Sequence, residues 1–289
     1  MKKQEIIIIG APRSGTNLLR DLLCSQKEFG TWPCDEINYI WRHLNRDYCS
    51  DEFPIELARN PVKEYIQNKF EKAFKEFNCK YLIEKTCANT LRVDFIKEVL
   101  PDAKFIFIFR DGLDCVNSAS KQWSKKPNLK YILRKAKFVP FWDIPFYGFS
   151  YVLNLVYKLL DKNSNYKYWG PKFKDWKKFT NQKDMKIFCA YQWKFCNEKA
   201  LASFKKMDKN FYMFISYEEI TANPEKSIER INKFIDPSKK IHINKKYINK
   251  VYINSNKGKS EIENPLKEEI YQIINSVQNN LNFYKKYSK

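Results

Sequence analysis

The sequence has few of the residue patterns that hold metals or form disulfides. None of its eight cysteines stands in a C-x-x-C pair, and its two histidines, His43 and His242, belong to no H-E-x-x-H or zinc-finger pattern. These absences exclude the common zinc sites, and we expect no metal cofactor. We also expect the cysteines to be reduced thiols, as is usual in a cytoplasm.

The sequence also lacks segments for export, membrane crossing or interdomain linkage. Its first expected strand begins near residue 5, which leaves no room for the charged and apolar parts of a secretion signal. No uninterrupted apolar run reaches the ~20 residues of a membrane span, and no Gly/Ser-rich or Pro-rich linker, repeat or low-complexity tract is present. We therefore expect a cytoplasmic protein in which residues 1–289 form one domain.

The formal net charge is +20, a value that would ordinarily suggest a nucleic-acid partner. Only nine of the 53 basic residues are arginine, and the lysines are spread along the chain. No RNA- or DNA-binding motif accompanies them. We therefore expect no nucleic-acid partner, but we expect the positive field to attract a polyanionic ligand.

Apolar runs alternate with helical patterns along the chain. This alternation predicts an α/β fold with a central parallel β-sheet flanked by helices, and ligand binding at the carboxyl ends of the strands. Strands are expected at residues 5–9, 81–84, 104–109 and 211–215, and helices at 15–26, 89–99, 112–124, 186–206 and 224–235.

A glycine-containing loop, Gly10-Ala-Pro-Arg-Ser-Gly-Thr-Asn-Leu-Leu19, joins the first expected strand to the first helix. Backbone N–H groups at such a junction bind phosphate. The loop keeps the glycine spacing of a nucleoside-triphosphate P-loop, but Thr16 and Asn17 stand where that motif has Lys and Ser/Thr. Arg13 supplies a cation instead, which suits an oxyanion without a bridging metal. The alternative is an ordinary strand–helix turn with one exposed arginine.

A second charged motif follows the apolar run 104–109. Arg110 ends that run, and Ser118 lies about two helical turns further along. If the helix packs across the strand end, both side chains reach one more phosphate. The alternative is a surface Arg110–Asp111 pair and a serine on a helix face.

Together the two motifs resemble those of the sulfotransferases that use 3'-phosphoadenosine 5'-phosphosulfate (PAPS). Three further segments extend the resemblance over most of the chain: Ile83-Glu-Lys-Thr86, Tyr217-Glu-Glu-Ile-Thr-Ala-Asn-Pro224 and Asn254-Ser-Asn-Lys-Gly-Lys259. The spacing around Glu36 and Lys85 is closer to the tyrosylprotein and heparan-type branches than to the cytosolic small-phenol branch, whose base is a histidine. Golgi members begin with a membrane anchor that this sequence lacks, which favours a bacterial-type enzyme.

The resemblance implies transfer of a sulfuryl group from PAPS to an acceptor hydroxyl, with adenosine 3',5'-bisphosphate as product and no metal requirement. It assigns Arg13 to the 5'-phosphosulfate. The rest of that cradle would be Ser14, Gly15, Thr16 and Asn17.

The other donor-site residues also come from the resemblance. Lys85 would neutralise charge on the transferring group, and Arg110 with Ser118 would bind the 3'-phosphate. Tyr217 would lie near the adenine, unless it is an ordinary core tyrosine. The loop of Lys257, Gly258 and Lys259 would close over the phosphates, unless it is a solvated turn.

The acceptor's base is expected to be Glu36, because the resembling branches place a catalytic glutamate shortly after the first helix. Partial burial beside Trp32 and Trp41 would raise its pKa. Asp35 is the competing base, and His43 is a weaker one. Alternatively, Asp35 and Glu36 simply cap the helix that follows them.

An insertion at about 125–180, mainly helical, is expected to form the acceptor site. Its aromatic segment 138–160 either covers the cleft, packs on the core, or touches a membrane surface. Trp142, Tyr147, Trp169 and Trp176 suit stacking on sugars, which favours a carbohydrate or glycolipid acceptor, although lipids and phenols fit almost as well. The sequence does not indicate an oligomeric state.

Two other functions fit parts of the pattern. A P-loop kinase for a small molecule would share the fold but would need the missing Lys and Mg²⁺ ligand. A nucleotide-binding protein without catalysis would need Arg13, Arg110 and Ser118, but would have no use for Glu36 and Lys85.

Overall fold

The computed structural model describes residues 3–123, 170–238, 247–248 and 262–287. The predicted loop of Lys257, Gly258 and Lys259 lies outside these residues, as do the aromatic segment 138–160 and most of the predicted insertion.

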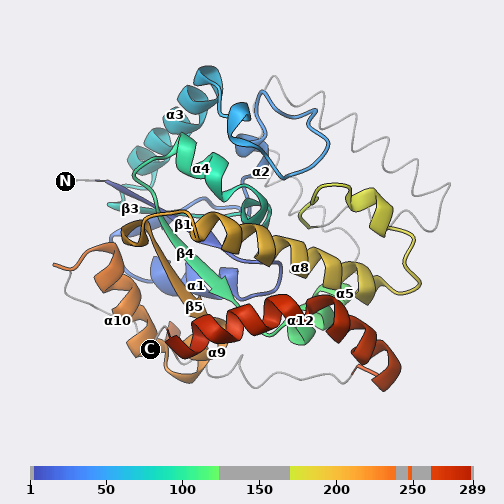
Figure 1. Cartoon of the computed structure of the whole chain (residues 1–289). Coiled ribbons are helices and arrows are strands. Elements are labelled where there is room, and N and C mark those ends of the chain that lie inside the picture. The colour runs from blue at the N-terminus through green and yellow to red at the C-terminus, as the bar shows by residue number, and fades with distance from the viewer. Residues whose placement is uncertain (1–2, 124–169, 239–246, 249–261, 288–289) are drawn as a thin grey trace.

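The centre of the protein is a parallel sheet of five strands (Figure 1). In spatial order β2-β3-β1-β4-β5, the strands are Phe29–Thr31, Tyr81–Lys85, Gln4–Ile9, Lys104–Phe109 and Tyr212–Ser216. All neighbouring pairs are parallel. The predicted α/β fold is therefore confirmed, and the sheet gains the short strand β2, which the sequence patterns did not predict.

The sheet is buried on both faces, which explains why its central strands are continuous apolar runs. Along β1 the side chains alternate, so Ile6 and Ile8 join one core cluster while Ile7 and Ile9 join the other. The same alternation holds in β4, where all residues from Phe105 to Phe109 are buried. The central strands are thus fixed in place by packing on both sides.

Helices cover both faces (Figure 1). In chain order they are α1 Thr16–Cys24, α2 Asn38–Trp41, α3 Asn60–Glu76, α4 Val93–Val99, α5 Gly112–Trp123, α8 Met185–Phe204, α9 Tyr217–Ala222, α10 Pro224–Ile235 and α12 Asn264–Tyr287. Short 3-10 turns are η1 Ile55–Leu57, η2 Cys87–Leu91, η5 Trp176–Phe179 and η6 Lys209–Phe211. Leucines of α1 and isoleucines of α10 pack on one face, and α3, α4 and α8 pack on the other.

Four of the five predicted helices are confirmed, but the fifth, 89–99, is wrong as a continuous helix. It breaks at Arg92, whose φ of −144° and ψ of 36° are not helical, into η2 and α4. Arg92 is 2 % exposed, and its guanidinium donates hydrogen bonds to Asn89 and Asn38 inside the protein. Side-chain hydrogen bonding therefore overrides the helical pattern there.

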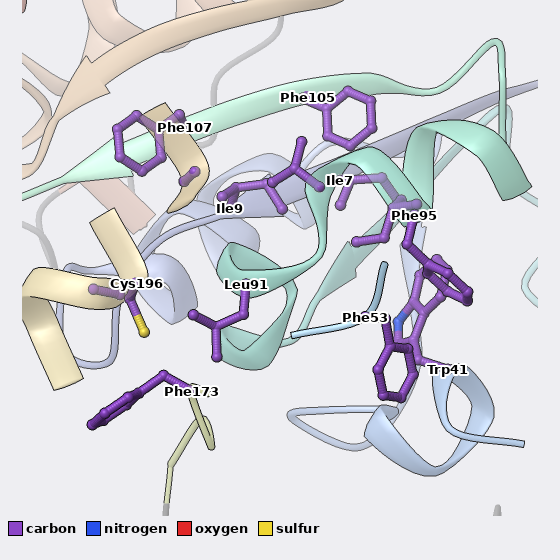
Figure 2. Close-up of a cluster of buried hydrophobic side chains, with 14 of the residues drawn as sticks. Ile7, Ile9, Trp41, Phe53, Leu91, Phe95, Phe105, Phe107, Phe173 and Cys196 are labelled. Atoms are coloured by element: carbon purple, nitrogen blue, oxygen red, sulfur yellow. The ribbon is translucent and has the colours of Figure 1, made fainter. Parts of the chain in front are cut away.

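The larger core cluster reaches from the sheet to α2 and to Phe173, in the described end of the predicted insertion (Figure 2). Phe53 and Phe95 meet edge to face with ring centroids 5.3 Å apart. Phe173 and Trp176 belong to the same cluster, and Trp176 is only 7 % exposed. The expectation that Trp176 stacks on a sugar is therefore wrong, because its ring is already packed inside the protein.

Among the described residues, no helix has the length and apolar character needed to cross a membrane. None of the eight cysteines takes part in a disulfide.

Candidate active site

The loop after β1 has the backbone of an anion-binding turn. Arg13 and Gly15 both adopt the left-handed region, with φ of 72° and 97°. A Cβ at Gly15 would lie 2.4 Å from Cδ2 of Tyr217, and one at Gly10 would lie 2.7 Å from the carbonyl oxygen of Ile108. Only glycine fits at these two positions. No side-chain hydrogen bond caps α1 and its first turn holds no acidic residue, so its N-terminal end suits a bound anion.

The remaining residues of this loop divide between the interior and the surface. Ser14 is buried, and its Oγ lies 3.7 Å from Sγ of Cys115 on α5. Thr16 is also buried, whereas Asn17 is exposed at the start of α1. The buried Ser14 thus contacts α5, while the side chains of Arg13 and Asn17 are exposed to solvent.

The structure brings the two predicted phosphate motifs together. Nε of Arg13 donates a hydrogen bond of 2.8 Å to Oγ of Ser118. Arg110 pairs with Asp114 at 3.0 Å, and its Cζ lies 4.2 Å from the centroid of the Tyr217 ring. Asp114 and Ser118 are four residues apart and therefore share one face of α5. Arg110 and Ser118 consequently lie along the same side of this helix, although they make different contacts.

Lys85 and Glu36 meet at the carboxyl end of β3. Nζ of Lys85 lies 3.5 Å from Oε1 of Glu36, and the same oxygen accepts the N–H of Cys87 at 3.3 Å. The side chain of Lys85 is 3 % exposed and that of Glu36 is 29 % exposed. Burial, the largest single effect, lowers the pKa of Lys85, but the negative charges of Glu36 and its acidic neighbours together outweigh burial, so the net pKa is raised. The ammonium therefore stays charged near neutral pH.

Residues 5–142, which contain all of these contacts except those of Tyr217, match the model of the Sulfotransferase family. This part of the chain belongs to the sulfotransferase family. The match includes the loop after β1, the Lys85 strand and the Arg110–Ser118 motif, so the resemblance inferred from the motifs is confirmed at the level of the family.

Solved sulfotransferases share the fold over nearly the whole chain. STF9 from Mycobacterium avium is 11 % identical, with a TM-score of 0.54, over 97 % of this chain and 77 % of its own. A sulfotransferase from Alicyclobacillus acidocaldarius is 13 % identical, with a TM-score of 0.52, over 98 % of this chain and 97 % of its own. No curated protein matches the sequence.

The other candidate bases have different partners. Asp35 is 46 % exposed and pairs with Arg20 of α1 at 3.1 Å, whereas Glu36 contacts Lys85. The ring of His43 stacks on Tyr65 of α3 with centroids 3.7 Å apart. The capping alternative is wrong, because α2 begins after Ile37 and no side chain caps it.

A cavity of about 710 Å³ opens beside Arg110, between α5, α9 and α12. Charged side chains of both signs line it, among them Asp111, Asp114, Lys267 and Lys285. Of the predicted site residues that the structure describes, only Arg110 lies in its wall. Nε of Arg110 is buried and has no hydrogen-bond partner among the described residues, which leaves that donor available to an anion.

The motif assignments missed a buried polar network behind Lys85. Glu84 is 1 % exposed, and burial, only partly offset by a hydrogen bond from Thr86 and by the charge of Arg92, raises its pKa to about 7. Asn89 is also fully buried. One sequence signal could have indicated this network, namely a carboxylate placed inside an apolar strand, since such residues are rarely buried without partners. In the described part of the chain, no three His, Cys, Asp or Glu side chains are arranged to hold a metal.

Proposed function

We propose that this protein transfers a sulfuryl group from PAPS to an acceptor hydroxyl and releases adenosine 3',5'-bisphosphate. The observation that carries the proposal is the contact between Lys85 and Glu36 at a strand end of a sulfotransferase fold. A buried ammonium beside a half-buried carboxylate supplies charge stabilisation and a proton acceptor at one place. A protein that only binds nucleotides would not need this pair.

The residues around the β1–α1 loop fit a donor with two phosphates. The α1 N-terminus, with Gly15 as its N-cap, and Arg13 would hold the 5'-phosphosulfate, together with Ser14, Thr16 and Asn17. Arg110 and Ser118 would hold the 3'-phosphate. The buried and unpartnered Nε of Arg110 supports this role, because an arginine fork suits phosphate. Tyr217 lies against both Gly15 and Arg110, which favours a position beside the nucleotide over an ordinary core role.

The chemical roles follow from these positions. PAPS supplies an activated sulfuryl group, so the protein needs to position it and to stabilise charge. Arg13 and Lys85 would face the negative charge that develops on the leaving phosphate. Glu36 would take the proton of the acceptor hydroxyl as that oxygen attacks sulfur. This use of a glutamate is the pattern of the tyrosylprotein and heparan-type branches.

We further propose that the acceptor is a carbohydrate or glycolipid and that the 125–180 insertion binds it. We propose that the chain forms a single cytoplasmic domain that contacts a membrane surface only peripherally, if its acceptor is there, and that it needs no nucleic acid. Trp142, Tyr147 and Trp169 are the aromatic side chains that support this acceptor class, and they lie outside the described residues. Lys257, Gly258 and Lys259 would close over the phosphates.

Calorimetric titration tests the donor site. We expect adenosine 3',5'-bisphosphate to bind more tightly than adenosine 5'-monophosphate or ATP–Mg²⁺. Arg110→Ala should weaken the bisphosphate by about ten- to hundredfold, the usual loss of a hydrogen bond to a charged group. Lys233→Ala is the matched control, because Lys233 is 67 % exposed on α10. The end of α10 contacts Lys104 at the start of β4, whereas Arg110 follows the other end of that strand. Preference for ATP–Mg²⁺ would favour the kinase alternative instead.

Two carboxylate variants test the base. Glu36→Gln should lower turnover by about 100-fold or more while leaving affinity for the bisphosphate unchanged, because a general base acts only in the transition state. Asp35→Asn should keep most of the activity, since Asp35 pairs with Arg20. The reverse result would assign the role to Asp35, and equal loss of binding and turnover in Glu36→Gln would contradict a role as base.

A further inference from the structure

Thr86, which follows Lys85, contacts the backbone that follows Glu36, and Glu84, which precedes Lys85, contacts Thr86. The N–H of Ile37 donates to Oγ1 of Thr86 at 3.1 Å, and that hydroxyl donates to Oε1 of Glu84 at 2.5 Å. Thr86 and Glu84 are 0 % and 1 % exposed. The backbone N–H of Ile37 can only donate, so the hydroxyl oxygen accepts it, and the hydroxyl proton is directed to Glu84.

A second path joins the same two segments. Oε2 of Glu84 accepts from Nδ2 of Asn89 at 2.7 Å, and Oδ1 of Asn89 accepts from Nε of Arg92 at 2.8 Å. Nη2 of Arg92 then donates to Oδ1 of Asn38 at 2.5 Å. Because Asn38 follows Ile37 in the chain, the two paths close into a ring. The ring joins β3 and η2 to the start of α2 through buried side chains and the half-buried side chain of Asn38.

This ring holds the backbone on both sides of the Glu36–Lys85 contact. Glu84 and Thr86 precede and follow Lys85, and Ile37 follows Glu36 directly. The first contact of the ring, from Ile37 to Thr86, is one residue away from each member of the pair. A shift of the segment at Ile37 would therefore change the distance of 3.5 Å between Nζ of Lys85 and Oε1 of Glu36.

We propose that Thr86 and Glu84 are positioning residues that set the geometry of the Glu36–Lys85 pair. They do so without touching either substrate, through the two hydrogen bonds that run from Ile37 to Glu84. The inference rests on the proposed function, because the position of the pair affects turnover only if Glu36 and Lys85 carry the reaction.

Substitutions at Thr86 test the inference by kinetics. Thr86→Val keeps the shape but removes both hydrogen bonds, and we expect turnover to fall by roughly ten- to hundredfold, as for a small misplacement of reacting groups. Affinity for adenosine 3',5'-bisphosphate should stay within about twofold, because the donor contacts lie elsewhere. Thr86→Ser restores the hydroxyl and should recover most of the turnover. Glu84→Gln should also lower turnover, since its amide cannot accept from both Thr86 and Asn89.

Thr90→Val is the matched control. Thr90 is fully buried in the same η2 turn, and its hydroxyl donates to the carbonyl of Cys87 at 2.8 Å without joining the ring. This variant loses the same chemical group from the same segment and should keep its turnover. Equal loss in Thr86→Val and Thr90→Val, or failure of Thr86→Ser to recover activity, would overturn the inference.

The NMR titration of Lys85 in lysine-labelled protein gives a readout that does not depend on activity. Glu36 raises the pKa of Lys85, so displacement of Glu36 in Thr86→Val should lower it, and Thr86→Ser should restore it. An unchanged titration in Thr86→Val would overturn the positioning role. If the wild-type protein transfers no sulfuryl group and does not bind the bisphosphate, the proposed function fails, while this titration still decides whether Thr86 sets the pair.

Discussion

Glu84 is a buried acid whose protonation links stability to pH. Burial raises its pKa from 4.5 to about 7 in the folded protein, so between these values the folded state binds more protons than the unfolded state. The contribution of Glu84 to stability is therefore fully present below pH 4.5 and is lost as the pH rises toward 7. Asp51, whose folded pKa is lowered, is ionised in both states over this window.

We expect Glu84→Gln to remove this dependence. The difference in unfolding free energy between wild type and variant should change by about 1.4 kcal/mol per pH unit between pH 5 and 7, in the sense that the wild type loses stability relative to the variant. Urea unfolding at several pH values measures it. A constant difference across the window would show that the pKa of Glu84 is not raised.

The backbone conformation of Gly15 determines the shape of the candidate anion-binding loop. Alanine at this position would keep a φ of 97° only under strain, and its Cβ would overlap the Tyr217 ring. We expect Gly15→Ala to lower the unfolding free energy by about 1–3 kcal/mol and to weaken binding of adenosine 3',5'-bisphosphate. Adding Tyr217→Ala should recover part of the stability but not the binding. If neither quantity changes in Gly15→Ala, the close approach of Tyr217 to the loop is wrong.

At the scale of elements, Asp51 ties three segments together. Its carboxylate pairs with Arg42 after α2 at 2.9 Å, lies 3.9 Å from Nη1 of Arg92 before α4, and accepts the N–H of Lys172 at 2.9 Å. The carboxylate is 5 % exposed and both arginines are largely buried. Without its charge, two buried guanidinium groups would face each other with no counter-ion.

We therefore expect Asp51→Asn to lower the unfolding free energy by about 3–5 kcal/mol, the usual cost of breaking a buried ion pair from one side. Asp47→Asn is the control, since Asp47 is 79 % exposed, lies 3.9 Å from Arg46, and should change stability by less than about 1 kcal/mol. Denaturant unfolding of both variants decides the matter. A comparable small effect from the two substitutions would contradict the structural role of Asp51.

The elements also show what the sequence could predict. Strands β1 and β4 were predictable because burial on both faces leaves a continuous apolar run. Arg13 and Arg110 were found because each follows such a run, whereas Lys85 was assigned from the resemblance to the sulfotransferase motifs. Strand β2 was missed because its three residues carry no periodicity. The break at Arg92 and the contacts of Asp51 were missed because they depend on side chains far apart in the sequence, which no local pattern records. The network around Glu84 had one local signal, a carboxylate inside an apolar strand, but that signal does not identify its partners.

At the scale of the whole molecule, the net charge of +20 acts on how fast an anionic ligand arrives. The candidate site adds its own local cations, Arg13, Lys85 and Arg110. Contacts with these three cations should mainly set the dissociation rate constant of the ligand, because they act at short range in a partly buried site. The distributed lysines should mainly set the association rate constant, because they act over distances at which salt screens the charge.

Rapid-mixing measurements with adenosine 3',5'-bisphosphate separate the two effects. Raising ionic strength from about 0.02 to 0.5 M shortens the screening length several-fold, and we expect the association rate constant to fall by roughly tenfold or more while the dissociation rate constant changes much less. Arg110→Ala should instead raise the dissociation rate constant and keep the salt dependence of association. Adenosine, which carries no charge, is the ligand control and should associate at a rate independent of salt. An equally salt-independent association of the bisphosphate would mean that the lysines contribute no steering field and that their number has no bearing on ligand capture.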